Sequence, residues 1–541
     1  MADAHDSRQR PIPAPLFLLA VVVILADALV SSGAEPPAGS TTKQYDLAAW
    51  LDERYDQIWA RNGIQPEFCD DATYCRRVSL DLMGRIPSVG EVRTFLEDPD
   101  PRKRERLVDR LLDDPDQSHL TSELHAEHMA RLWRRTLVPP GTTGANMAAL
   151  IEPWLKQQFR DNRPFDDLVR QLLTARGEDS VPEAIIFQAL GGTPETEATE
   201  ICRVFLGVRI GCAQCHDHPF ADWKQRDFWG VAAYFSGTTA RSTRQLASGG
   251  QTVPAGLSDD GATGQISMDG IAYPAKPLWT DEPITLADNQ KPRDQLADWL
   301  TSADNPAFSA NAVNRVWQLL LGRGLVPSVD DLDQATPAER ALIVDDLGEQ
   351  FAAAGFDLKW LIAGICKSKV YQCSAHLLPG DRVTFVYGRR PLKTLTPEQT
   401  FDSLEQALHL PVSSTSELAA RHNGEMSQIV RRLDESLSTS PEEYSAGVPQ
   451  VLLLMNGDLL ANATDLDKSR TLRGVVESPF LGTNEKLDAL YLAALTRLPQ
   501  TAERAALLNH LQGQPDEKSR RIAYGDIFWA LLNSPEFVLC R

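Results

Sequence analysis

Two cysteines and a histidine near the middle of the sequence have a spacing that can carry a cofactor. Residues 211–220 read GCAQCHDHPF, so Cys212, Cys215 and His216 form a C-x-x-C-H pattern. Two cysteines three residues apart on one helical turn can each add to a vinyl group of haem, and the next imidazole can then bind the iron. The pattern predicts a covalent c-type haem, with His216 as the metal ligand.

Three other interpretations of this motif stay open. Cys212 and Cys215 could form a redox-active or structural disulfide, although no βαβ pattern precedes them as in thioredoxin-type sites. The two cysteines could bind zinc together with His216 and His218, although no second C-x-x-C or H-x-x-x-H pair supplies distant ligands. The pattern could also occur by chance within a helical core.

A sixth ligand would set the potential of the haem iron and decide whether the iron is open to small molecules. The segment SELHAEHMARLWRR (122–135) places His125, His128 and Met129 on one helical face. These residues are candidates for a distal ligand or for a separate metal site. The alternative is a polar helix face with Met129 in the core.

The residues that follow the motif each have two candidate roles. His218 is too close to His216 to reach the opposite face of the same haem, so we expect it to contact a propionate or to cap the Pro219–Phe220 turn. Trp223 and Lys224 could likewise contact propionates or simply pack against the protein.

The other cysteines could form local disulfides in an oxidising compartment. Cys69 and Cys75 are six residues apart, and Cys366 and Cys373 are seven apart. Their spacing permits a bridge within each pair but leaves the connectivity open.

The N-terminus has the order of a secretory signal peptide. Two arginines precede an apolar run at 16–26, and small residues follow it at 32–34. This order predicts a signal peptide at 1–34, and hence export to the periplasm or cell surface. The run is shorter than a spanning helix and no other charge-free stretch is as apolar, so we expect no transmembrane segment in the mature chain.

Composition and charge exclude several classes of protein. Of the 541 residues, 43% are hydrophobic and 24% are charged, as in globular proteins rather than disordered or collagen-like chains. With 54 basic and 74 acidic residues, the formal net charge is −20. A protein that binds nucleic acid has a basic surface instead, so we expect no nucleic-acid partner.

Helix signals dominate the sequence. The pattern predicts a helix over 101–114 that is capped by Asp100. Its apolar stripe comprises Leu107, Val108, Leu111 and Leu112. Capping boxes of the Ser/Thr-x-x-Glu/Gln type begin at Ser88, Thr336, Thr396 and Ser440. Helix starts spread along the chain in this way predict a mainly α fold.

A stretch without helical period divides the chain. Residues 236–294 are rich in Gly, Ser and Thr, and the segment QISMDGIAYPAKPLW alternates as a short β-ribbon would. We therefore predict two helical domains, at 45–240 and 291–541, joined by a linker or inserted loop at 241–290.

Several long segments resemble a known pair of domains. For the first domain they are RRVSLDLMGRIPSVGEVRTFL (76–96) and GVRIGCAQCHDHPFADWKQRDFWGVAAYF (207–235), and for the second they lie at 296–332, 450–457 and 528–537. The pair resembled is that of the planctomycete cytochrome-c-associated PSCyt/PSD families, whose domains of unknown function occur together in exported proteins. The C-x-x-C-H motif of these families corresponds to Cys212, Cys215 and His216. The resemblance implies location and architecture rather than a reaction.

The leading hypothesis is an exported, mostly helical redox or electron-transfer protein that carries one covalent haem and meets a redox partner protein. A second hypothesis is a hydrolase or accessory factor in extracellular polymer degradation, since the helical body is larger than one haem requires. It predicts an acidic cleft that includes Asp330, Asp331 and Arg323, although Asp330, Asp331 and Asp333 are also typical of a solvated loop. A third is a non-catalytic cell-surface scaffold, in which Cys212 and Cys215 form a structural bridge.

Overall fold

The computed structural model describes most of the chain after the predicted signal peptide. The described residues are 46–113, 120–139, 148–177, 182–241, 244–245, 252–253, 256–285, 290–375, 388–409, 465–466 and 468–541. The predicted signal peptide at 1–34 lies outside them. Among the helices described, none combines the length and the apolar character that a membrane span requires.

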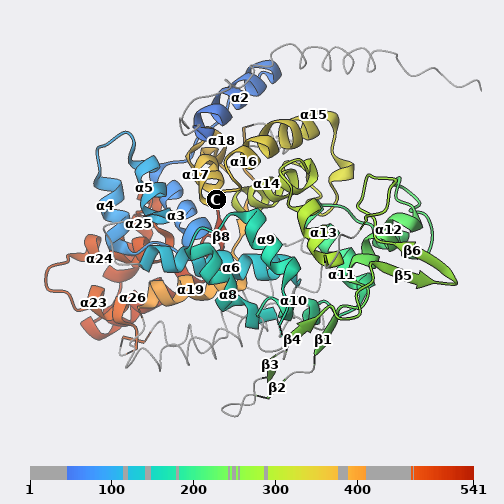
Figure 1. Ribbon diagram of the computed structural model, residues 1–541. Coiled ribbons are helices and arrows are strands. Elements are labelled where there is room, and N and C mark those ends of the chain that lie inside the picture. The colour runs from blue at the N-terminus through green and yellow to red at the C-terminus, as the bar shows by residue number, and fades with distance from the viewer. Residues whose placement is uncertain are drawn as a thin grey trace, which may run out of the picture. The chain divides into compact units, whose positions relative to one another are not determined.

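Helices form most of the described chain and the β-structure is limited to two-stranded sheets, so the predicted mainly α fold is confirmed (Figure 1). The first helices are α2 (Leu47–Asn62), α3 (Asp71–Met83), α4 (Val89–Glu97), α5 (Lys103–Leu112), α6 (Leu120–Leu137), α8 (Glu152–Arg160), α9 (Phe165–Thr174), α10 (Ala184–Ala189), α11 (Pro194–Ile201) and α12 (Gln225–Ala232). They are followed by α13 (Pro292–Leu300), α14 (Pro306–Leu321), α15 (Pro337–Arg340), α16 (Glu349–Ala353), α17 (Leu358–Lys367), α18 (Lys369–Gln372), α19 (Pro397–Leu408), α23 (Arg470–Val476), α24 (Thr483–Leu495), α25 (Thr501–Gln512) and α26 (Glu517–Leu532). Short 3-10 or π-helical turns are η1 (Ala149–Ile151), η2 (Cys202–Leu206), η3 (Gly211–Gln214), η4 (Ala233–Phe235), η5 (Leu332–Gln334) and η6 (Ala341–Gly348).

Three of the predicted capping boxes are present. Ser88 Oγ accepts a hydrogen bond from the Glu91 N–H at 3.3 Å, and the Glu91 carboxylate accepts one from the Ser88 N–H at 2.8 Å. Thr336 and Thr396 begin α15 and α19 with the same pair of bonds. The fourth box, at Ser440, lies outside the described residues. Each cap satisfies N–H groups that a helix start leaves without partners.

The helix predicted over 101–114 is shorter than expected. Its α-helical part is α5, which begins at Lys103, because Asp100 accepts hydrogen bonds from the next N–H groups and closes a turn ahead of the helix. The Asp100 carboxylate accepts from the Arg102 N–H at 2.7 Å and its carbonyl accepts from the Lys103 N–H at 3.1 Å. The predicted apolar stripe is buried as expected, in Leu107, Val108, Leu111 and Leu112.

The predicted β-ribbon is a hairpin of β5 (Gln265–Met268) and β6 (Ile271–Pro274). Met268 pairs with Ile271, which leaves Asp269 and Gly270 as a two-residue turn. Their φ angles are 50° and 80°, as a type I′ turn requires, and Asp-Gly favours this turn. The other sheets pair β1 (Thr239–Arg241) with β4 (Gly256–Ser258), β2 (Arg244–Gln245) with β3 (Thr252–Val253), and β7 (Lys393–Thr394) with β8 (Leu539–Cys540).

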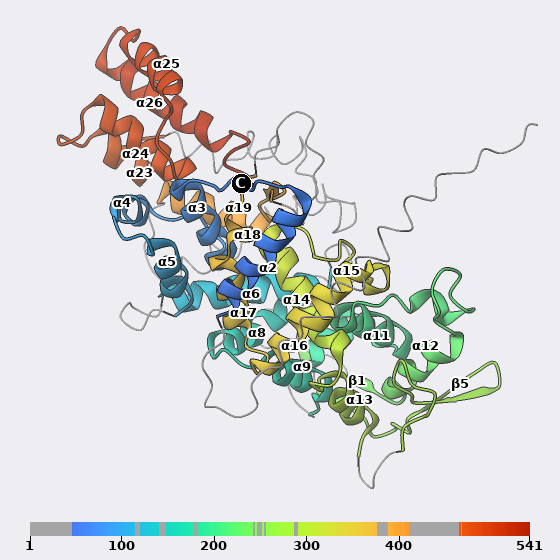
Figure 2. The same cartoon turned by 90° about the horizontal axis from the view of Figure 1, so that it is seen from above.

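Two hydrophobic cores draw on residues from both sides of the 241–290 segment. The first contains side chains from α2 to α18, and Tyr55 of α2 stacks on Trp317 of α14 with ring centroids 6.1 Å apart. Both views show α2 beside α17 (Figures 1 and 2). The second core joins Leu80 and Ile86 to α19 and α23–α26. The domain limits at 240 and 291 stay a prediction from sequence, but helices of the two regions share these cores.

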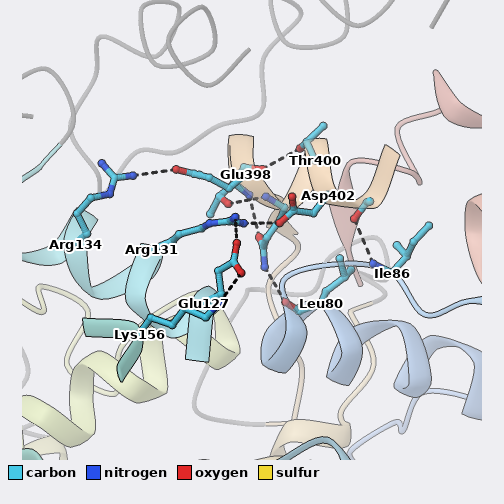
Figure 3. A network of polar contacts seen from close by, with 12 residues as sticks. Leu80, Ile86, Glu127, Arg131, Arg134, Lys156, Glu398, Thr400 and Asp402 are labelled. Carbon is cyan, nitrogen blue, oxygen red and sulfur yellow. Dashed lines mark hydrogen bonds and ion pairs between the residues drawn. The ribbon is translucent and has the colours of Figure 1, made fainter. Parts of the chain in front are cut away.

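A network of ion pairs ties α6 to α19 (Figure 3). Arg131 contacts Asp402 at 2.5 Å, and Arg134 and Arg135 contact Glu398 at 3.1 and 2.9 Å. Burial alone would raise the pKa of Glu398, but the two guanidinium groups lower it below its ordinary value. Because its buried carboxylate is matched by cations in this way, we assign the network a structural role.

Candidate functional site

The C-x-x-C-H motif forms a short, exposed turn between α11 and α12. Residues Gly211–Gln214 make the 3-10 turn η3, in which Ala213 is buried in the first core. Cys212, Cys215 and His216 are all exposed. The buried alanine therefore anchors the turn while the three predicted site residues lie at the surface.

Side chains of α12 fix the backbone of this turn. The indole N–H of the buried Trp229 donates to the Gln214 carbonyl at 3.1 Å. The Gln225 amide donates to the carbonyls of Gln214 and Cys215 at 3.1 and 3.2 Å. The Gln225 backbone N–H donates to the Asp217 carboxylate at 3.0 Å, and this bond lowers the pKa of Asp217. The turn therefore presents its thiols from a backbone that is hydrogen-bonded to a buried helix.

His216 and the nearby His218 use their Nδ1 atoms in opposite ways. His216 Nδ1 lies 2.8 Å from the Asp217 carbonyl oxygen, which can only accept, so Nδ1 carries a proton and the lone pair of the neutral ring lies on Nε2. His218 Nδ1 accepts from the backbone N–H groups of Phe220 and Ala221 at 3.2 and 2.9 Å, so its neutral ring carries the proton on Nε2. A metal binds a ring nitrogen through its lone pair. His216 can therefore bind a metal through Nε2, whereas His218 could do so only by giving up the turn.

The donors that this turn offers are one imidazole and two exposed thiols. His218 caps the Pro219–Phe220 turn, which is one of its two predicted roles. A zinc site with four ligands from this segment would therefore lack His218 as a ligand. Within the described segments, His, Cys, Asp and Glu side chains do not gather in groups of three that could hold a metal ion. A c-type haem needs only one imidazole and two reachable thiols from this motif. His216, Cys212 and Cys215 supply these.

The local disulfides that the spacing permits are absent, since all eight cysteines are free. The pairs that could have formed them are Cys69 with Cys75 and Cys366 with Cys373. Cys75 and Cys366 instead lie inside α3 and α17, where burial raises the pKa of Cys75 to about 12 and that of Cys366 above its ordinary range. Buried thiols of this kind are unreactive. The exposed thiols are those of the C-x-x-C-H motif.

The candidate distal ligands lie in the core rather than at the motif. Helix α6 packs against α3, α5 and α8, and it buries His125, His128 and Met129. His125 Nδ1 is 2.9 Å from the Leu82 carbonyl, and the His128 ring lies so close to Gly84 that a Cβ there would be 2.6 Å from Nδ1. Burial lowers the pKa of His125 to about 4 and that of His128 to about 3, so both rings are neutral. Their role is packing, with Met129 in the core.

Residues after position 300 support the motif from a second side. The Trp223 indole N–H donates to the Asp333 carboxylate at 2.8 Å, and the Leu332 N–H donates to the Gly207 carbonyl at 2.7 Å. Gly207 has a φ of 63°, and a Cβ there would lie 2.7 Å from Asn311 Oδ1. Only glycine fits this close approach of the two segments.

Asp330, which the hydrolase hypothesis places in an acidic cleft, is already paired. Its carboxylate contacts Arg315 at 2.6 Å and Arg203 at 3.2 Å. Burial raises its pKa, but these two cations lower it below the ordinary value. Arg315 also donates to the Val204 carbonyl at 2.7 Å. Asp330 thus joins α14 to η2 rather than standing open to a substrate.

Sequence reasoning missed the residues that hold the motif in place. Trp223 packs in the core, as one of its predicted roles required, but its bond to Asp333 was not expected. Lys224 is exposed and lies 3.6 Å from the Asp217 carboxylate. One usable signal was the four-residue spacing of Gln225 and Trp229, which places both on one helix face.

Two family models match separate regions of the chain. The model PSCyt2, described as "Protein of unknown function (DUF1549)", matches residues 51–240. The model PSD1, described as "Protein of unknown function (DUF1553)", matches residues 292–438. No curated protein and no solved structure matches the chain. The chain belongs to the family of proteins that pair the PSCyt2 and PSD1 domains of unknown function.

Proposed function

We propose that the protein is an exported c-type haem protein that takes part in electron transfer. Cys212 and Cys215 would attach the haem, and His216 would bind its iron. The observation that carries this proposal is the hydrogen bond from His216 Nδ1 to the Asp217 carbonyl at 2.8 Å. Metal-binding histidines are oriented by such a bond, which leaves the Nε2 lone pair for the metal. The two thiols beside this imidazole are exposed and unbridged.

The residues of the turn have distinct tasks in this proposal. Each thiol would add across one vinyl group, so that its sulfur would form a thioether to one carbon and its proton would go to the other, with no oxidant consumed. When bound, the haem supplies an iron that gains or loses one electron. Gln225 and Trp229 keep the peptide groups of the turn in place, and Asp217 holds the imidazole of His216 through its carbonyl.

Export is part of the same proposal. The predicted signal peptide at 1–34 would direct the chain to the periplasm or cell surface. In bacteria, covalent haem attachment occurs outside the cytoplasm, so the signal and the motif support one another.

The test is expression of the full chain in a bacterial host that carries c-type haem maturation machinery. We expect a Soret band that survives acid–acetone extraction and an intact mass that is greater by one haem. Cys212→Ser with Cys215→Ser should lose both signals. His218→Asn should keep both, because the asparagine Oδ1 can replace Nδ1 as the acceptor of the turn.

A colourless protein would overturn the proposal. If its mass showed the loss of two hydrogens between Cys212 and Cys215, the scaffold hypothesis with a structural bridge would gain support. If both thiols stayed free and Cys212→Ser left a hydrolytic activity unchanged, the hydrolase hypothesis would be favoured instead.

A further inference from the structure

Two aromatic side chains stand exposed beside the C-x-x-C-H turn. Phe220 is 95% exposed and Trp279 is 55% exposed. The two are linked through Trp223, whose ring contacts that of Trp279 and whose carbonyl accepts a hydrogen bond from the His218 N–H at 2.8 Å. Exposed aromatic side chains of this size are typical of interaction sites. Phe220 lies in the turn that His218 caps, so it belongs to the same surface as the motif.

The surrounding structure holds these side chains at the surface. Trp279 has a φ of 59°, a left-handed conformation that a bulky residue adopts only where its surroundings impose it. Its ring lies edge-on to Trp223 with centroids 5.7 Å apart, and it tilts against Trp299 at 6.2 Å. Since Trp223 is anchored to Asp333, the exposed indole rests on a fixed base.

Exposed acidic side chains outnumber exposed basic ones in the segments that carry the two aromatic residues, 217–226 and 279–282. The exposed acids are Asp217, Asp222, Asp281 and Glu282, and the exposed bases are Lys224 and Arg226.

Both bases already have acidic partners. Lys224 lies 3.6 Å from Asp217, and Arg226 lies 3.4 Å from Asp281. In the described part of the chain, Asp222 and Glu282 form no ion pair. The rim therefore carries a net negative charge, as does the whole chain, with a formal net charge of −20.

We propose that Phe220 and Trp279, with their acidic rim, form the docking surface for a basic one-electron carrier protein. An aromatic centre with a charged rim provides both the contact area and the electrostatic steering of a transient complex. A second copy of this chain would bring the same acidic rim against it, and an anionic lipid surface would also repel it. A basic protein is the partner that the charge favours.

That the partner is an electron carrier rests on the proposed haem at Cys212 and Cys215. The docking surface itself does not depend on that haem. The carrier would lose one electron as the haem site of this protein gains one, or the reverse. Docking on Phe220 brings the partner to the turn that bears His216, so the electron crosses a short path.

The test uses the full-length protein and a small basic cytochrome c as the probe, with binding measured by titration calorimetry at several salt concentrations. Phe220→Ser should raise the dissociation constant about tenfold, as expected for an aromatic interface anchor. Asp222→Asn with Glu282→Gln should raise the dissociation constant at low salt and flatten its salt dependence. Phe480→Ser is the matched control, since Phe480 is 92% exposed between α23 and α24. It should leave binding unchanged.

Two results would overturn the docking proposal: no binding of the probe at low salt, or equal losses for Phe220→Ser and Phe480→Ser. The haem content of the wild-type protein, measured beside its binding of the probe, separates this proposal from the proposed function. If the wild-type protein carries no haem but binds the probe through Phe220, the haem proposal fails and the docking surface stands. If haem is attached and the probe does not bind, only the docking surface fails.

Discussion

Replacing His218 with alanine tests whether its Nδ1 atom holds the turn as a hydrogen-bond acceptor. His218 Nδ1 accepts the backbone N–H groups of Phe220 and Ala221 at 3.2 and 2.9 Å, and alanine leaves both without this partner. A typical protein hydrogen bond contributes about 0.5–1.5 kcal/mol net. Two of them give about 1–3 kcal/mol for closing this turn. The loss is local, because the rest of the motif stays bonded to Gln225 and Trp229.

Hydrogen exchange measured by mass spectrometry on peptides that span 211–224 reads this local stability. Exchange protection reports the free energy of local opening. A loss of about 1–3 kcal/mol corresponds to roughly 5- to 150-fold faster exchange at Phe220 and Ala221. His218→Asn is the matched control, since its Oδ1 can accept the same two bonds and should retain most of the protection.

Two outcomes would refute this reasoning. Exchange in His218→Ala that matches the wild type would mean that Nδ1 does not hold the turn. Loss of the haem signals in His218→Asn, together with their retention in His216→Ala, would mean that the two histidines have the opposite roles.

Three further predictions concern stability. Burial lowers the folded-state pKa of His125 to about 4 and of His128 to about 3, so only the unfolded chain binds their protons between those values and 6.5. The free energy of unfolding should therefore fall by about 1.4 kcal/mol per pH unit for each ring as the pH drops through this window, which urea titrations at successive pH values would show. Burial also raises the pKa of Glu197 from 4.5 to about 8, so the folded state holds a proton that the unfolded chain has lost and stability should fall as the pH rises through that range; Glu197→Gln should remove this slope in the same titrations, and an unchanged slope would contradict the assignment. Asp81→Asn should cost about 3–5 kcal/mol, because it leaves the two cations that contact this buried carboxylate without their counter-charge, and a thermal unfolding midpoint equal to the wild type would show that the pairing is not needed.

Sequence reasoning succeeded where the interactions are local. The capping box at Ser88 and the Asp-Gly turn at 269–270 depend on side chains within a few residues, so their patterns specify the structure they form. The start of α5 was misplaced because Asp100 can bond either to a helix start or to the turn before it. Local patterns leave such choices open.

The roles of the histidines were beyond the reach of sequence patterns. His125 and His128 have the spacing of a ligand pair, but both rings are buried against Leu82 and Gly84, which are distant in sequence. The proton positions on His216 and His218 likewise depend on where neighbouring carbonyl and N–H groups point. Spacing identifies residues that could bind a metal, while the backbone around them decides which nitrogen is available.

The contacts around the motif give a physical reason for the pairing of the two family domains. The turn that presents Cys212 belongs to the PSCyt2 region, yet Trp223 beside it is anchored by Asp333 of the PSD1 region. Gly207 approaches Asn311 so closely that a side chain would not fit, and its carbonyl accepts from Leu332. The proposed cofactor site would need to be held within a fraction of an ångström, and these buried partners fix the backbone around it. Removing the PSD1 region would expose these buried surfaces and release one side of the turn, so the two domains are better regarded as one structural unit built around a single motif.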